Sequence, residues 1–229
     1  MADPVHTHPS GFELADLGAS YSRPVEGIPG AIEVIDALSE DECTNVIQAC
    51  ENLGFTPASL TTPAGPVMRL DLRDNYSLMF ICNHETLNRL AKRVIDCLPA
   101  EIDGWVLDLE APLNKLFRVY RYEAHQKFAP HLDGSYCSSD TRVSMMTMLV
   151  YLNEDFEGGT TTFFPEGRLK LGGPTEQVEP VDVHPVTGNI LLFPHGLATQ
   201  SPLHQGTRHL SEGKYKYVLR TDVMFTMKK

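Results

Sequence analysis

The sequence predicts an α+β protein that is mainly β, in which N-terminal helices support a barrel or sandwich of short strands. Two helical patterns precede residue 112, and after Leu113 the chain consists of short β-branched and aromatic runs separated by Gly and Pro turns. Helices followed by strands are typical of a sheet with its helices on one face. With 229 residues and 42% hydrophobic content, the chain can bury one substantial core. We therefore expect one domain over residues 27–229, with helical support over about 27–112 and the barrel core over about 113–226.

Residues 1–26 are predicted to form a flexible tail or a strap laid on the surface. They contain scattered Pro and Gly without hydrophobic periodicity. They also lack a basic segment followed by an apolar stretch, which argues against a secretory signal or a membrane span. The five cysteines form no C-x-x-C pair and fit reduced thiols. These features predict a cytoplasmic protein without a membrane partner.

Two amphipathic helices are predicted in the N-terminal half. Ser39 and Glu42 form a capping-box pattern, and apolar residues then recur on one face at helical spacing as far as Leu53. A second apolar stripe runs from Leu87 to Leu98 and is ended by Pro99. Both stripes are expected to face the core.

The C-terminal half is predicted to contain at least six strands. Gly-rich and Pro-containing turns at residues 157–159 and 185–188 separate some of them. The expected strands are Leu116–Tyr122, Val143–Leu152, Thr160–Phe164, Val178–His184, Asn189–Phe193 and Tyr215–Phe225.

The charge of the chain bears on its partners. The formal net charge is −11 and the isoelectric point is near 5.2. Nucleic-acid binding relies on Lys and Arg side chains that displace counterions from phosphates. This chain is therefore not expected to bind a nucleic acid.

A candidate metal site begins with His131 and Asp133. Residues two apart on a strand leave the same face, so the imidazole and the carboxylate can converge on one ion. His204, just before the final long strand, is the expected third ligand, and three such ligands form the facial triad of non-haem iron oxygenases. A single H-x-D pair arises readily by chance among nine histidines. The alternative third ligands are His184, His195 and His209.

Several segments in a consistent order resemble the prolyl 4-hydroxylase-like branch of the 2-oxoglutarate/Fe(II)-dependent dioxygenase superfamily. The resemblance covers about residues 113–226, roughly half of the chain. The segments that carry it are Arg121-Tyr122, residues 130–134 around His131 and Asp133, residues 147–153, residues 157–163, residues 185–193, His204-Gln205-Gly206 and residues 216–223.

This resemblance implies a double-stranded β-helix (jelly-roll) barrel that binds Fe(II) through His131, Asp133 and His204. It also implies 2-oxoglutarate and O2 as cosubstrates and ascorbate as a reductant. The implied reaction hydroxylates a C–H bond while 2-oxoglutarate is converted to succinate and CO2.

The distal carboxylate of 2-oxoglutarate would lie deep in such a barrel and would need a fixed cation. Lys214, Lys216 and Arg220 share one face of the last strand by its period of two, although a basic stripe of this kind also occurs on solvent-facing edges. Counting from His204 favours Lys214, whereas alignment of the strand favours Lys216, and we select Lys216. Tyr122 and Thr147 are the expected hydroxyl partners of the same carboxylate.

Substrate choice in such a fold resides in loops over the barrel mouth. Residues 61–75 and 135–142 are the candidate loops, and within them Arg73, Asn75 and Arg142 are predicted to contact substrate. A prolyl residue of a protein or peptide is the first expectation, and a free amino acid or small metabolite is the alternative. A jelly-roll or cupin-like protein without catalytic activity, serving in metal binding or interaction, is the alternative from another class.

Overall fold

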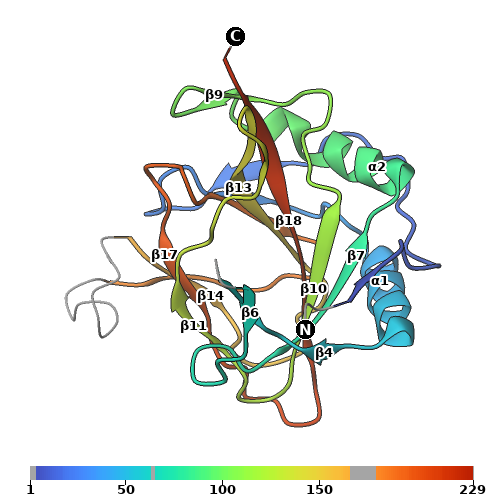
Figure 1. Cartoon of the computed structure of the whole chain (residues 1–229). Coiled ribbons are helices and arrows are strands. Elements are labelled where there is room, and N and C mark those ends of the chain that lie inside the picture. The colour runs from blue at the N-terminus through green and yellow to red at the C-terminus, as the bar shows by residue number, and fades with distance from the viewer. Residues whose placement is uncertain (1–3, 63–64, 166–178, 229) are drawn as a thin grey trace.

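The computed structural model describes residues 4–62, 65–165 and 179–228 and has three layers. A large sheet lies in the middle, with a four-stranded sheet on one side and two helices on the other (Figure 1). The helical elements are α1 (Glu40–Leu53), α2 (His84–Val94) and the short 3-10 helix η1 (Ile95–Cys97).

The large sheet has twelve strands. Its main path is β1 (Val5–His6), β7 (Tyr76–Ile81), β10 (Leu116–Tyr122), β18 (Lys216–Met227), β13 (Arg142–Tyr151), β16 (Ile190–Pro194), β3 (Ile32–Val34) and β2 (Ser22–Pro24). Four strands pair outside this path: β4 (Thr56–Pro57) with β7, β12 (Cys137–Ser139) with β13, β9 (Trp105–Leu107) with β18, and β8 (Glu101–Ile102) with β9.

The smaller sheet carries two of the predicted metal ligands. Its order is β11 (Phe128–His131), β17 (Leu203–Gly206), β14 (Thr161–Phe164) and β15 (Val181–Val183). A separate hairpin consists of β5 (Leu60–Thr62) and β6 (Gly65–Val67). The chain is thus mainly β, as predicted.

Both predicted helices are present. Ser39 accepts a hydrogen bond from the backbone N–H of Glu42, whose carboxylate accepts one from the Ser39 N–H, so the predicted capping box begins α1. The second helix ends earlier than predicted, at Val94, and continues as η1 toward Pro99. No described helix is long and apolar enough to cross a membrane.

The predicted strands are also present, within a few residues. Leu116–Tyr122 matches β10 at both ends. The strand expected over residues 178–184 is shorter, since β15 covers Val181–Val183 and residue 178 lies outside the described residues.

Residues 5–24 differ from the predicted flexible tail. Val5–His6 pairs in parallel with β7, and Ser22–Pro24 pairs with β3. Phe12 and Leu14 are each 1% exposed within the main hydrophobic cluster. Burial of these two apolar side chains explains why the segment is held in place. Isolated apolar residues of this kind leave no periodic signal in a sequence.

Side chains of the large sheet alternate between two hydrophobic clusters. Val150, Leu192 and Leu219 belong to the cluster that also contains the buried faces of α1 and α2. Their neighbours Tyr151 and Leu191 belong to a second cluster, which includes Phe163 of β14 and therefore lies between the two sheets. The period of two of a strand thus places one face toward the helices and the other toward the space that holds the candidate site.

Candidate active site

Three side chains converge between the two sheets. His131 ends β11, Asp133 follows it by two residues, and His204 on β17 lies opposite His131 in the strand register. One ligand atom of each lies within 4.8 Å of the others. The Nε2 atoms of His131 and His204 are each 3.6 Å from an oxygen of Asp133. Among the described residues this is the set that can hold a metal ion, and the predicted triad is therefore brought together.

Both imidazoles present Nε2 to the centre of this set. His131 Nδ1 donates to the carbonyl of Ala129 at 2.8 Å, and His204 Nδ1 donates to that of Pro202 at 3.1 Å. A ring that carries its proton on Nδ1 leaves the lone pair of Nε2 for a metal. Burial, with His131 nearby, lowers the pKa of His204 to about 3. Two imidazole nitrogens and one carboxylate on one side of an ion suit Fe(II).

Asp133 is buried and ionised. Burial would raise its pKa, but Arg220 and then His204 and His131 hold the pKa well below the ordinary value. Arg220 donates from Nη1 to Oδ1 of Asp133 at 2.8 Å, and the Thr147 hydroxyl donates to Oδ2 at 2.7 Å. The carboxylate is therefore held from two sides.

Lys216 lies in the same pocket as a buried cation. Its side chain donates to the carbonyl of Gly159 at 2.7 Å, and Nζ lies 5.2 Å from the centroid of the Tyr122 ring. No carboxylate of the described residues lies within ion-pair distance of it, and burial lowers the pKa of Lys216 to about 7. Gly159 has φ +66°, and a Cβ there would lie 3.3 Å from Lys216 Cδ, so glycine leaves room for this side chain.

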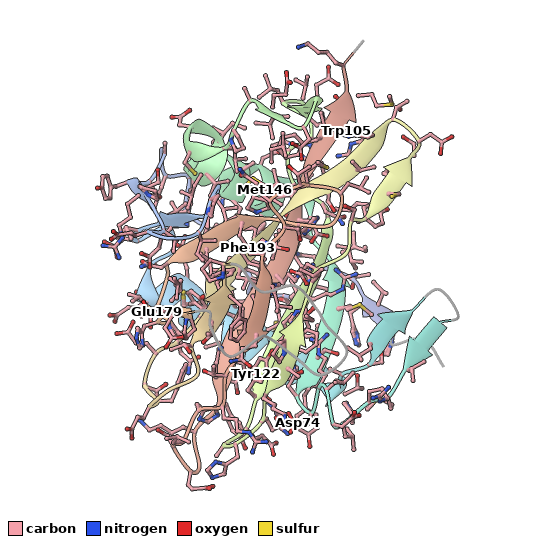
Figure 2. The ribbon with its side chains drawn as sticks, turned by 90° about the vertical axis from the view of Figure 1, so that its left-hand side faces the viewer. Asp74, Trp105, Tyr122, Met146, Glu179 and Phe193 are labelled. Atoms are coloured by element: carbon pink, nitrogen blue, oxygen red, sulfur yellow. The ribbon has the colours of Figure 1, made fainter. Side chains whose placement is uncertain are left out.

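The pocket combines these ligands with groups from both sheets. Figure 2 places Tyr122 toward the end of the molecule where Asp74 lies and away from Trp105. The residues that line the pocket are Tyr120, Tyr122, Phe128, His131, Asp133, Leu149, Thr161, His204, Gln205, Gly206, Lys216, Val218 and Arg220.

Two candidate groups for the cosubstrate carboxylate lie elsewhere. Lys214 precedes β18, is half-exposed and pairs with Asp155, because the strand and its alternation begin only at Lys216. Thr147 does not line the pocket, since its hydroxyl is directed to Asp133. Arg220 does line the pocket, but as the partner of Asp133.

The three residues predicted to contact substrate are not among those that line the pocket. Arg73 is buried behind it, with its guanidinium 4.3 Å from the Tyr120 ring centroid and 4.4 Å from that of Phe128. Asn75 is also buried and accepts a hydrogen bond from Arg73. Arg142 pairs with Asp108 at 2.6 Å. Their place in the two candidate loops made them candidates, but each has a hydrogen-bond or ion-pair partner within the chain.

Several pocket residues escaped sequence analysis. Tyr120 lies two residues before Tyr122 on β10, so the period of two could have indicated it. Thr161 comes from β14, and its sequence gives no such signal. His195, an alternative third ligand in the sequence, is fully buried, and both its ring nitrogens have hydrogen-bond partners.

Comparison with known proteins shows which family this arrangement is similar to. Residues 117–221, which include all three clustered side chains, match the family model described as 2OG-Fe(II) oxygenase superfamily. The chain is therefore similar to this superfamily over just under half of its length. The protein named Prolyl 4-hydroxylase 1 of Arabidopsis thaliana is 28% identical over 219 aligned residues, which cover 89% of this chain and 72% of that protein. This similarity implies that the site uses Fe(II), 2-oxoglutarate and O2.

Solved structures share the jelly-roll fold of this oxygenase. A viral collagen prolyl hydroxylase from Paramecium Bursaria Chlorella virus-1, in complex with 2-oxoglutarate, has a TM-score of 0.56 and 22% identity, with 85% of this chain and 95% of that chain covered. A prolyl hydroxylase from Trichoplax adhaerens, in complex with a peptide fragment of hypoxia inducible factor, has a TM-score of 0.61 and 18% identity. The match covers 85% of this chain and 83% of that chain.

Proposed function

We propose that this oxygenase hydroxylates a prolyl residue of a protein or peptide in a reaction that consumes 2-oxoglutarate and O2. The observation that carries the proposal is one pocket that contains two imidazoles, one carboxylate and a separate buried lysine side chain without a carboxylate partner among the described residues. The first three groups suit Fe(II), and the fourth suits the far end of a dicarboxylate. The jelly-roll barrel, supported by α1 and α2, would hold the four groups on paired strands.

His131, Asp133 and His204 would hold the iron. When bound, Fe(II) and 2-oxoglutarate supply the oxidation of a C–H bond by O2, with succinate and CO2 as coproducts. Carbonyl acceptors orient the two imidazoles, so little reorganisation would be required of them. Burial of Asp133 and His204 between the sheets would limit the access of bulk water to the reacting groups.

Lys216 would bind the distal carboxylate of 2-oxoglutarate, with the Tyr122 hydroxyl as a neutral partner. Burial raises the pKa of Tyr122 to about 12, so its phenol keeps the proton that it would donate. An anion beside Lys216 would favour the charged form of that side chain. Binding of the cosubstrate would therefore compensate the cost of burying Lys216.

The surface beside β11 supports a peptide substrate. Val67, Met68 and Leu70 are each more than two-fifths exposed and lie in one segment of chain. This segment continues to Leu72, whose carbonyl accepts a hydrogen bond from Ala129 of β11. An exposed apolar segment next to a metal ligand strand is suited to a peptide with prolyl side chains. The names of the relatives, prolyl hydroxylases of peptides and collagen, agree with this choice.

The first experiment adds Fe(II) and 2-oxoglutarate to metal-free protein without oxygen and records the visible charge-transfer band of the chelate. We expect a band in the wild-type protein and none in His131→Ala. A folded wild-type protein without a band would contradict the iron site and would favour the inactive jelly-roll alternative.

The second experiment identifies the substrate. Proline-rich peptides, free proline and other free amino acids are incubated with the loaded enzyme and O2, with and without ascorbate, and products are analysed by mass spectrometry. We expect addition of one oxygen to a prolyl residue of a peptide, with matching formation of succinate. Oxygen on a free amino acid alone would overturn the peptide assignment and leave the reaction class intact.

A further inference from the structure

The segment Phe193-Pro194-His195-Gly196 holds Asp133 by its backbone. Gly196 donates its N–H to the carbonyl of Asp133 at 3.0 Å, and His195 donates its N–H to the carbonyl of Met145 at 2.9 Å. Gly196 has φ +59°, and a Cβ there would lie 2.0 Å from the hydroxyl oxygen of Ser135. Only glycine permits this close approach to the residues after the H-x-D pair.

The same segment reaches the side chain of Asp133 through a chain of hydrogen bonds. His195 Nδ1 lies 2.7 Å from the Thr147 hydroxyl, which lies 2.7 Å from Oδ2 of Asp133. His195 Nε2 lies 2.8 Å from the Ser144 hydroxyl. Ser144, Thr147 and His195 are all fully buried, so water cannot replace these contacts.

Burial lowers the pKa of His195 and so favours the neutral ring, for which the donors and acceptors allow one assignment of protons. Asp133, an ionised carboxylate beside Arg220, can only accept, so the single hydroxyl proton of Thr147 points to it. The Thr147 oxygen then accepts from His195, which places the proton of the imidazole on Nδ1. Nε2 of the neutral ring must accept, and the Ser144 hydroxyl supplies the donor, while Ser144 itself accepts the N–H of Tyr136 at 2.8 Å.

We propose that His195 is a positioning residue for the iron site: as the Nδ1–H tautomer it fixes the Thr147 hydroxyl as a donor to Asp133, and so orients the carboxylate for metal binding. This inference rests on the proposed function of Asp133 as an iron ligand. Arg220 binds the other oxygen, so the two oxygens are distinguished by their partners. Groups that orient a metal ligand in this way affect metal affinity although they do not touch the metal.

The test compares two pairs of variants. His195→Leu removes both ring contacts, whereas His195→Asn keeps an N–H donor at the place of Nδ1. Thr147→Val removes the hydroxyl, whereas Thr147→Ser keeps it. His184→Leu, at an exposed histidine, is the matched control. For each, Fe(II) affinity is measured without oxygen, and thermal unfolding verifies the fold.

We expect Fe(II) dissociation constants to rise about 10–100-fold in His195→Leu and Thr147→Val, and His195→Asn and Thr147→Ser to recover most of that loss. His184→Leu is expected to match the wild-type protein. Folded His195→Leu protein that binds Fe(II) as tightly as the wild type would overturn the proposal. A wild-type protein that binds no Fe(II) would instead overturn the proposed function, and the inference with it.

A second readout does not depend on the variants being folded. NMR of metal-free wild-type protein with nitrogen-labelled histidine reports which ring nitrogen of His195 carries the proton. We expect one neutral tautomer with the proton on Nδ1. A proton on Nε2 would reverse the direction of the hydrogen bonds and would overturn the proposal, even if iron binds normally.

Discussion

Two buried cations of this protein, Arg93 of α2 and Lys216 of β18, differ in what surrounds them. Arg93 donates four hydrogen bonds, two to the carboxylate of Glu42 and one each to the carbonyls of Ala15 and Ala37. Lys216 donates to a single carbonyl, that of Gly159.

The difference distinguishes a charge that is neutralised within the chain, which we call the structural charge, from one that has no carboxylate partner among the described residues. Arg93 is bound to its counterion within the chain and ties the N-terminal segment to both helices. Lys216 is buried, and no carboxylate of the described residues pairs with it. Burial disfavours its charged form and lowers the pKa of Lys216 to about 7. A cation that destabilises the free protein and faces a pocket is suited to bind an anion that arrives from outside.

The comparison is tested most strongly by Lys216→Met. We expect 2-oxoglutarate affinity to fall on the order of 10²–10³-fold, the loss typical of removing one partner from a buried ion pair. Without ligand, the variant should be more stable than the wild-type protein at pH 6, by about 3 kcal/mol, because it buries no charge. Titration of the charge-transfer band and denaturant unfolding measure the two effects.

The pH dependence provides the control for this variant. The pKa of Lys216 is about 7 in the folded protein and near 10.5 when exposed, so the unfolded chain binds more protons between these values. Stability of the wild-type protein should therefore rise with pH across this window, and the advantage of Lys216→Met should shrink. A constant difference would contradict the assignment of a buried, unpaired ammonium.

Glu42→Gln tests the structural charge. Burial would raise the pKa of Glu42, but hydrogen bonds from Arg93 and from the N–H groups of Ser39 and Ala15 lower it from 4.5 to about 2. Such a group stabilises the fold above the unfolded pKa, so the wild-type protein should lose about 3 kcal/mol as pH falls from about 4.5 through 2. Glu42→Gln should lack this loss and should be less stable by about the same amount at pH 7.

Ligand binding distinguishes the two charges in this experiment. Glu42→Gln protein that remains folded should bind 2-oxoglutarate as tightly as the wild type, since Glu42 lies among the helices and not in the pocket. Weakened binding by a fully folded variant would show that the two regions are coupled.

The smallest effect is expected from Lys214→Met. Lys214 is half-exposed and pairs with Asp155, and exposed pairs contribute at most about 0.5 kcal/mol to stability here. The affinity for 2-oxoglutarate should stay within about twofold of the wild-type value. Since Lys214→Met and Lys216→Met differ only in position, an equal loss of affinity in both would contradict the choice of Lys216 as the anchor.

Much of the site could be predicted because its signals are local. His131 and Asp133 share a strand face by the period of two, whereas Lys216 was selected over Lys214 because the strand that follows it resembles the family. The ends of β10 and the capping box of α1 were predictable for the same reason, since each depends on residues a few positions apart.

Two residues predicted at the site make other contacts in the structure. Thr147 carries a hydroxyl that could bind a ligand, but this hydroxyl donates to Asp133. The sequence does not indicate this contact, because β13 and the segment after His131 meet only in the folded chain. Arg73 was predicted to contact substrate from a loop at the barrel mouth, but its guanidinium stacks on Tyr120 and Phe128, which come from two other segments of the chain.

The sequence by itself determined the class of the fold, the likeness to an oxygenase family and the two-residue spacing of His131 and Asp133. Each of these depends on residues that are close together in the sequence. The tertiary structure decided which histidine completes the set, which lysine is buried and which hydroxyl orients the carboxylate. Those choices depend on distances between strands, such as the opposition of His131 and His204 across β11 and β17. Burial and hydrogen bonding then give each group its charge state, and both exist only after the sheets have packed.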